Sequence, residues 1–548
     1  MARKVDIVFN RYYRYDEITE YLKAVAAAYP GLARLESVGK SYAGRDIWAL
    51  TLTNQATGPD SEKPAIYVDG NIHAGEVTAS AVCLYTIHYL VSNFGSDEEV
   101  THLLDTRAFY ILPRVNPDGA EMYLTTPYTL RSSVKPYPLS LEEVDELPGL
   151  RAEDIDGNGV ILTMRVRDDR RGEWRMSDKD ARLMVARRPG ERKGPFYHVY
   201  TEGIIDQYEG EPFAIKGSPY GLDLNRNFPQ NWDLEVRGGG NYPGSEPEAR
   251  TIIDFIIQHK NINLLNAFHT YGGFFFRNPY QYGDDKIDQD DLRAMREIAR
   301  EGTYVTGYPD IKSNNRATLT EWAYEQHGLI AYTTELWDRL GRAGIQRDEM
   351  MKADTPEKRE AIQLKLLEWN DRELGGRGFY NWTEFDHPQL GKVEIGGWHP
   401  KFVLQNPPHH LLEAECHKNA QWVLRQAAAL PEASLGEITV EKVRDGVYKL
   451  TALCENIGYL PTYTTNKGKG VGAVKPDVVR LLGDCQVLAG KPEVEIGHLE
   501  GYMNGQGRGP ARSCARASWL VQAAAGSELT VELETQRAGV DRKGIKLE

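Results

Sequence analysis

The sequence predicts an α/β domain followed by a smaller all-β domain, and three observations support this fold class. Between about residues 8 and 430, apolar runs of strand length alternate with helical stretches, a pattern typical of a sheet with helices on both faces. From about residue 435, short alternating strands separated by turns predict a β-sandwich. The 548 residues also exceed one ordinary core. We therefore predict domains at 1–430 and 435–548.

The predicted elements can be followed in order along the chain. Residues 125–220 interrupt the α/β pattern because they are rich in charge, proline and glycine, and we predict that they form an insertion. The α/β domain is expected to contain helices at 12–29, 77–91, 290–305, 320–327 and 411–428, and a further helix that begins within 244–250. Its expected strands are two within 35–52, joined by a turn, and one each at 64–69, 108–112, 262–268 and 330–335. The sandwich is expected to contain strands at 438–440, 447–453, 478–482, 517–521 and 529–533.

Composition limits the classes of partner. A net charge of −14 argues against nucleic acid or an anionic membrane as the main partner. No apolar run reaches the roughly 18 residues that a transmembrane helix needs. The N-terminal residues lack the apolar segment of a signal peptide, so a cytoplasmic location is the default expectation, although a secreted chain that had lost its signal would look the same. Five scattered cysteines predict no disulfide framework, and the oligomeric state is open.

Candidate metal ligands lie where predicted strands end. His73 and Glu76 stand between the strand at 64–69 and the following helix, and their spacing of three lets an imidazole and a carboxylate reach one ion. His269 follows the strand at 262–268 in the same way. Separately, such residues are more often a solvated turn pair and a structural histidine. Together they match the two-nitrogen, one-oxygen ligand set of a catalytic zinc with an open position.

Further polar residues could support such a centre. Asp223 could orient a ligand imidazole through its second ring nitrogen. Glu335 ends an apolar strand, where burial would raise its pKa toward the range of a general base, unless it is a salt-bridged structural acid. Asn225 and Arg226 offer an amide and a planar guanidinium suited to gripping a carboxylate, although such a pair is also common at surfaces.

A second ion is suggested inside the insertion. Asp154, Asp156 and Asn158 alternate in front of Gly159, like the first half of a calcium-binding loop. Arg165 occupies the place where a bidentate glutamate would close that loop, which excludes a complete EF-hand. A partial calcium site and a plain Asx-turn with a hairpin are the two interpretations.

Seven stretches in a fixed order give the sequence a recognisable likeness. They are Tyr42–Trp48, His73–Glu76, Asn116–Gly119, Asp223–Phe228, Ser245–Glu248, His269–Tyr271 and Thr333–Leu336. Over residues 8–430 the chain resembles the zinc metallocarboxypeptidases of the carboxypeptidase A type, the funnelin-like enzymes. The resemblance implies a mixed eight-stranded sheet flanked by helices, one Zn²⁺ per chain, and hydrolysis of the C-terminal bond of peptides or proteins that carry a free terminal carboxylate.

The resemblance also implies residue roles. His73, Glu76 and His269 would hold zinc, Glu335 would be the general base, and Asn225 with Arg226 would grip the substrate carboxylate. For the arginine that polarises the scissile carbonyl, the best match is Arg165, with Arg167 in reserve.

The pocket for the substrate's side chain departs from the family pattern. The family's mobile tyrosine lies 22 positions before the catalytic glutamate, and that count reaches Ser313 in this chain. Tyr308 is the nearest aromatic residue that could replace it. The base of the side-chain pocket would be the neutral Thr320, which argues against a preference for Lys or Arg. Tyr308 and Tyr280 would favour apolar or aromatic side chains, whereas an inward Arg277 or Arg316 would favour acidic ones.

Two other functions compete with an exopeptidase. The missing tyrosine and the insertion motivate an endopeptidase or amidase acting on cell-wall or modified peptides. A non-catalytic zinc-binding protein is the other alternative, and the complete set His73, Glu76, His269 and Glu335 argues against it.

Overall fold

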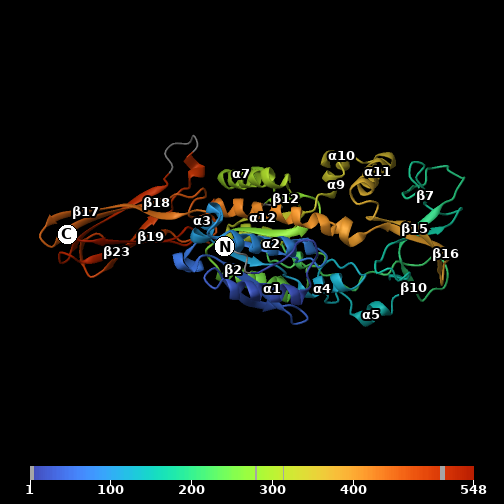
Figure 1. Cartoon of the computed structure of the whole chain (residues 1–548), viewed down its shortest axis with the longest axis horizontal. Coiled ribbons are helices and arrows are strands. Elements are labelled where there is room, and N and C mark those ends of the chain that lie inside the picture. The colour runs from blue at the N-terminus through green and yellow to red at the C-terminus, as the bar shows by residue number, and fades with distance from the viewer. Residues whose placement is uncertain (1–4, 278–280, 313, 506–511) are drawn as a thin grey trace.

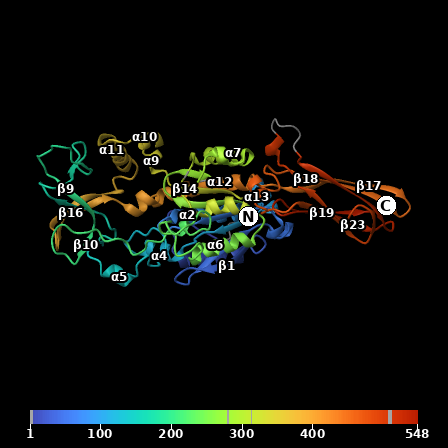
Figure 2. The same ribbon diagram turned by 180° about the vertical axis from the view of Figure 1, so that it is seen from behind.

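The computed structural model describes residues 5–277, 281–312, 314–505 and 512–548. The molecule is elongated, with an α/β core in the middle, a β-sandwich at one end and an accessory β-sheet at the other (Figures 1 and 2). Among the described residues, no helix combines the length and the apolarity that a membrane crossing requires.

A mixed sheet of eight strands forms the centre of the core, as predicted. Four inner strands, β4, β3, β11 and β14, are parallel, while β1, β2 and β12 run antiparallel to a neighbour. In spatial order the strands are β1 (Ala33–Lys40), β2 (Asp46–Leu52), β4 (Ala108–Leu112), β3 (Ala65–Gly70), β11 (Ile262–Thr270), β14 (Ile330–Leu336), β12 (Phe274–Arg277) and β13 (Asp310–Lys312).

Helices cover both faces of this sheet because its inner strands are apolar on both sides. Along β3, Ile66 and Val68 belong to one hydrophobic core while Ala65 and Tyr67 belong to the other. The first face packs against α1 (Tyr15–Ala28), α2 (Val77–Asn93), α3 (Glu98–Thr106), α7 (Gln289–Thr306) and α12 (Leu412–Ala428). The second packs against α6 (Pro247–Gln258) and α8 (Leu319–His327). The short helix α4 (Pro117–Thr125) follows β4.

The accessory sheet contains the predicted insertion together with a later segment. Its six strands, in order, are β15 (Phe379–His387), β16 (Gly391–Trp398), β6 (Thr163–Arg167), β9 (Tyr197–Thr201), β7 (Trp174–Met176) and β8 (Met184–Ala186). Beside it lie the pair β5 (Gly149–Ala152) and β10 (Gly203–Asp206) and the helices α5 (Leu141–Asp145), α9 (Arg339–Arg342), α10 (Arg347–Met351) and α11 (Pro356–Glu373). A bridge between Tyr137 and Tyr220 marks where the inserted chain leaves the core and returns.

The C-terminal region is the β-sandwich that the sequence predicts. One sheet consists of β17 (Ala433–Arg444), β18 (Val447–Asn456), β22 (Cys514–Gln522) and β20 (Gln486–Ala489). The other consists of β21 (Glu493–Gly497), β19 (Asp477–Gly483), β23 (Glu528–Thr535) and β24 (Gly539–Lys546), and the short helix α13 (Asn466–Gly470) precedes it. Leu450, Trp519 and Val531 are buried in the core that the two sheets share.

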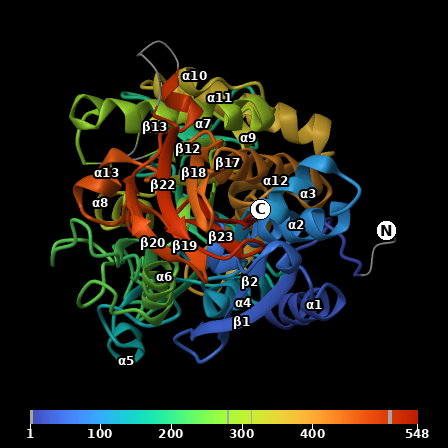
Figure 3. The ribbon, with the colours of Figure 1, turned by 90° about the vertical axis from the view of Figure 1, so that its left-hand side faces the viewer.

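The sandwich packs against one end of the core. Figure 3 views the molecule from this end, and α7 and α8 of the core are labelled in it. The buried guanidinium of Arg537 donates to the carbonyl of His327 at 2.6 Å, at the C-terminal end of α8. At the start of β11, the Asn263 amide donates to the Arg537 carbonyl at 2.7 Å. The sandwich is therefore attached to the C-terminal end of α8 and to the start of β11.

Candidate active site

The site lies at one edge of the sheet, where the carboxyl ends of parallel strands meet. The loop after β3 carries His73 and Glu76, β11 carries His269 near its end, and β14 carries Glu335. The carboxyl ends of parallel strands lie at the same edge of a sheet, so residues about 200 positions apart in the sequence come together.

The loop that holds His73 has a fixed shape. Gly70 closes β3 where an added Cβ would lie 2.8 Å from the backbone of Ala79, so a larger residue does not fit. Asn71 has a positive φ of 62°, a conformation that asparagine adopts more readily than most residues. Its side-chain amide donates to the carbonyl of His73 at 2.6 Å, and Arg114 Nε donates to its oxygen at 3.1 Å. These bonds hold the loop in one conformation.

Three donor atoms converge in this loop and at the end of β11. His73 Nδ1 lies 2.9 Å from Glu76 Oε1 and 3.1 Å from His269 Nδ1. His269 Nδ1 in turn lies 2.9 Å from Glu76 Oε2. All three residues are buried and form a group able to hold a metal ion. Tetrahedral ligands at about 2.0–2.1 Å from Zn²⁺ would lie about 3.3 Å from one another, so the donor set and its spacing fit zinc.

Asp223 and Arg131 surround this group. The second nitrogen of His73, Nε2, lies 2.9 Å from Asp223 Oδ1, which leaves Nδ1 for the ion. Asp223 is itself fixed because it caps the 3₁₀ turn Leu224–Arg226. Arg131 donates to Asp223 Oδ2 and to Glu76 Oε1, both at 3.1 Å, and its guanidinium is half-exposed.

The pKa values of the two carboxylates beside the histidines are shifted in opposite directions. Burial alone would raise the pKa of Glu76, but the imidazoles of His73 and His269 outweigh it and hold that pKa well below its usual range. Burial raises the pKa of Glu335 to about 7. One carboxylate therefore remains an anion while the other can accept and release a proton near neutral pH.

Six of the predicted site residues line one small cavity of about 40 Å³. The lining residues are His73, Arg131, Asn225, Arg226, His269, Phe276, Asn315, Thr318, Thr320, Thr333 and Glu335. Asn225 accepts the backbone N–H of Leu319 at 3.0 Å, and Arg226 donates to the carbonyl of Asn225 at 2.7 Å. The cavity thus combines the two histidines of the metal-ligand group, a titratable carboxylate and a guanidinium–amide pair.

The structure corrects the prediction for Arg165. This residue lies on β6 of the accessory sheet, where its guanidinium binds Glu394 at 2.9 and 2.8 Å and covers the ring of Trp382. The reserve candidate, Arg167, is paired with Asp169. Arg131 occupies the expected place beside the metal-ligand group instead. Sequence reasoning missed it because it falls inside the predicted insertion, although it follows the Asn116–Gly119 turn closely.

Tyr308 also lies elsewhere. Its side chain is buried in the core, where its hydroxyl bonds to Glu415 and accepts the backbone N–H of Trp337 at 3.0 Å. It does not line the cavity, so it does not replace the family's mobile tyrosine. Ser313 and Tyr280 lie outside the described residues.

The two arginines weighed for acidic specificity are both occupied by carboxylates. Arg277 binds Asp284 at 2.7 Å and Asp310 at 2.8 Å, and Arg316 binds Asp233 at 2.7 Å. Neither therefore offers an uncompensated charge to a substrate.

The predicted calcium loop has carboxylates close enough to share an ion. Asp154, Asp156 and Glu202 form the second group able to hold a metal. The same carboxylates already accept backbone N–H groups, for example Glu202 from Leu162 at 2.8 Å. The side-chain amide of Asn158 donates to Asp156 at 2.9 Å, which is the hydrogen bonding of a turn. Calcium binding here stays a prediction.

Comparison with known proteins agrees with this geometry. Residues 18–346 match the family described as zinc carboxypeptidase, and residues 432–546 match a domain of unknown function (DUF8731). Carboxypeptidase B of Astacus astacus is 27% identical over 352 residues, which cover 60% of this chain and 88% of that protein. Carboxypeptidase A2 of Rattus norvegicus is 36% identical over 292 residues, covering 53% of this chain and 52% of that protein.

Two further matches are shorter or more distant. A zinc carboxypeptidase of Saccharothrix mutabilis subsp. capreolus is 34% identical over 118 residues, covering 22% of this chain and 27% of that protein. The crystal structure of carboxypeptidase A from Helicoverpa armigera is 20% identical, covers 60% of this chain and 66% of that chain, and superposes with a TM-score of 0.41. The family match spans more than half of the chain and favours hydrolysis of C-terminal peptide bonds over the amidase alternative. The chain therefore belongs to the zinc carboxypeptidase family of metal-dependent peptide hydrolases.

Proposed function

We propose that this pocket removes single, uncharged residues from the C-terminus of peptides, with zinc held by His73, Glu76 and His269. The observation that supports this most directly is that one cavity is lined by the two histidines of the metal-ligand group, by Glu335 and by the Asn225–Arg226 pair. Zinc bound there would lower the pKa of a water ligand toward about 7 and polarise the scissile carbonyl.

In this proposal Glu335 transfers protons. Its pKa of about 7 lets the carboxylate take a proton from the attacking water and deliver it to the departing amine. Arg131 stabilises the negative charge that develops on the carbonyl oxygen, because its guanidinium lies beside the ligand group and is half-exposed toward a substrate. Asp223 keeps the ring of His73 in one orientation.

Asn225 and Arg226 would set the position of cleavage. A guanidinium can bind a terminal carboxylate through two parallel hydrogen bonds. Because Arg226 and Glu335 line the same cavity, a gripped carboxylate places only the last peptide bond over the ligand group. Thr318, Thr320 and Thr333 supply hydroxyl groups and no charge to the wall, which supports a preference for uncharged terminal side chains.

Comparing one peptide with a free and an amidated C-terminus tests this function. The zinc-loaded wild type should turn over the free acid faster in kcat/KM by on the order of 100-fold, since the clamp needs a carboxylate partner. In Arg226→Met this preference should largely disappear while zinc content is unchanged. Equal turnover of both peptides by the wild type would favour the endopeptidase or amidase alternative instead.

A further inference from the structure

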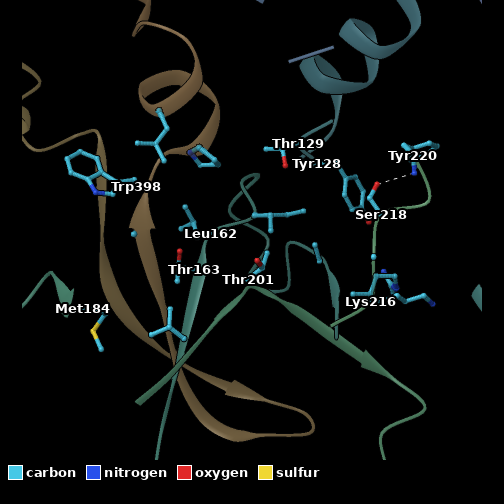
Figure 4. Close-up of a pocket in the computed structure, with 18 of the residues that line it drawn as sticks. Tyr128, Thr129, Leu162, Thr163, Met184, Thr201, Lys216, Ser218, Tyr220 and Trp398 are labelled. Carbon is cyan, nitrogen blue, oxygen red and sulfur yellow. Dashed lines mark hydrogen bonds between the residues drawn. The ribbon is translucent and has the colours of Figure 1, made fainter. Parts of the chain in front are cut away.

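A second, larger cavity lies outside the candidate active site. It has a volume of about 840 Å³, within the range of about 300–1,000 Å³ that ligand pockets occupy. Strands β6, β9, β15 and β16 of the accessory sheet form one wall, and the segments around residues 128–129, 216–220 and 400–404 form the other. Figure 4 shows side chains from both walls, including Trp398, Met184 and Tyr128, facing the cavity.

The lining is mostly apolar, and its cationic side chains are paired with carboxylates. Leu162, Met184 and Trp398 are among the hydrophobic residues of the wall. Lys216 binds Asp206 at 2.7 Å, and Arg182 binds Asp371 at 2.7 Å. An anionic ligand would have to compete with these carboxylates, whereas uncharged apolar groups would bury against the wall at no such cost.

This cavity is continuous along the chain with the candidate active site. Thr129 lines the cavity and lies two residues before Arg131, and Tyr220 lines it three residues before Asp223. Since an extended residue spans at most about 3.6 Å, these lining residues begin within about 7 to 11 Å of residues that contact His73. About two to three extended residues cover that distance. A peptide whose first one or two upstream residues lie over the ligand group would therefore reach the cavity with its third to fifth residue upstream of the scissile bond.

A third connection comes from the segment after β16. Leu404 lines the cavity, and the neighbouring Gln405 packs so closely on Gly75 that an added Cβ there would lie 2.6 Å from its amide oxygen. The amide of Asn406 donates to the carbonyl of Gly75 at 2.7 Å. The cavity and the His73–Glu76 loop therefore share one rigid support.

From this continuity we infer that the accessory-sheet cavity binds apolar side chains of the substrate, three to five residues upstream of the bond that is cut. The inference rests on the proposed function, because it assumes that a peptide occupies the catalytic pocket. It assigns a role to the accessory sheet: the sheet selects which longer peptides are trimmed, while the catalytic pocket selects the terminal residue.

The experiment compares kcat/KM for acetylated hexapeptides with one uncharged C-terminal residue and either glycine or leucine at upstream positions three to five. Wild type should prefer the leucine peptides at least tenfold. Thr201→Trp fills the cavity from an exposed position that Figure 4 labels, and should reduce the preference to within about twofold. Thr383→Trp makes the same change at an exposed position of β15 that does not line the cavity, and should keep the wild-type preference.

A second variant and a short substrate complete the test. Met184→Gln replaces an apolar lining group yet keeps an acceptor for Arg165, whose Nη1 lies 3.3 Å from the Met184 sulfur. This variant should also weaken the preference for leucine. A blocked dipeptide cannot reach the cavity, so all variants should hydrolyse it alike. If the wild type does not hydrolyse the dipeptide, the proposed function is contradicted. Dipeptide hydrolysis without an upstream preference, or a preference that survives both Thr201→Trp and Met184→Gln, would overturn the inference about the cavity.

Discussion

His269 of β11 and Glu335 of β14 are register partners on neighbouring parallel strands. Paired residues of parallel strands point to the same face, so a candidate metal ligand and a titratable carboxylate are held side by side by backbone hydrogen bonds. Neither depends on a loop for its position. This strand pairing fixes the position of the proposed base Glu335 relative to the candidate metal ligand His269.

Replacing Glu335 by glutamine should therefore abolish proton transfer and leave the metal-ligand group intact. We expect kcat to fall by about 10²–10⁴-fold, the usual contribution of a positioned acid or base. Zinc per chain, measured by atomic absorption, should match wild type. A variant that keeps wild-type turnover with full zinc would show that Glu335 is not the base.

Arg131 and Arg165 form a matched pair for testing the correction made by the structure. Arg131→Met should lower kcat by about 10²–10³-fold, since it removes one donor from the developing oxyanion. Arg165→Met should leave kcat per folded molecule unchanged, because that residue pairs with Glu394 in the accessory sheet. Steady-state kinetics on both purified variants would decide, and the reverse pattern would restore the original assignment.

Asp223→Asn should loosen the metal site without removing a ligand. The carboxylate accepts from His73 Nε2 at 2.9 Å, and an amide retains the shape but not the charge of this partner. We expect zinc affinity to fall by about 10–100-fold. Competition with a fluorescent chelator measures this directly. An unchanged zinc affinity would mean that the contact does not orient the ring.

The sequence predicts the strand-end residues well because their signal is local. His73, His269 and Glu335 each follow an apolar run, and an α/β sheet brings such ends together. The prediction for Arg165 was wrong because choosing among the arginines requires knowing where the inserted chain leaves the core. That position is set by the bridge between Tyr137 and Tyr220, which are distant in the sequence.

Other features of the structure have no local sequence signal either. Tyr308 was predicted at the pocket, but its position depends on Glu415 of α12, more than 100 residues later. The strands β15 and β16 complete the accessory sheet through pairing with β6, for example Ile395 opposite Met164. Such non-local pairing is decided by burial across the whole chain rather than by neighbouring residues.

Calcium binding by the loop at residues 154–158 can be tested at constant zinc. If the Asp154, Asp156 and Glu202 carboxylates share an ion, Ca²⁺ at 100 times its Kd would add about 2.7 kcal/mol of stability and raise the Tm. Asp156→Ser should remove this shift, while the exposed Asp178→Asn should retain it. Calorimetry with and without Ca²⁺ gives the answer. An absent shift in wild type would leave the plain turn as the explanation.

The buried carboxyl of Asp477 should make the stability of the sandwich depend on pH. Burial raises the pKa of Asp477 to about 7. Among the described residues only its Oδ2 accepts hydrogen bonds, including one from Thr462 at 2.6 Å, while Oδ1 lies 4.0 Å from His498 Nδ1. The folded state therefore holds a proton that the unfolded chain releases near pH 4. Stability from this group is complete below about pH 4 and is lost as pH rises through about 7.

Asp477→Asn cannot ionise, so it should lose less stability than wild type between pH 5 and pH 8. The difference should be on the order of 2 kcal/mol, because each unit of pKa shift corresponds to about 1.4 kcal/mol. Asp484→Asn, at an exposed position of the same domain, should follow the wild-type profile. Thermal unfolding of the three proteins at both pH values measures these profiles. Parallel profiles for Asp477→Asn and wild type would show that Asp477 does not hold a proton in the folded state at pH 5.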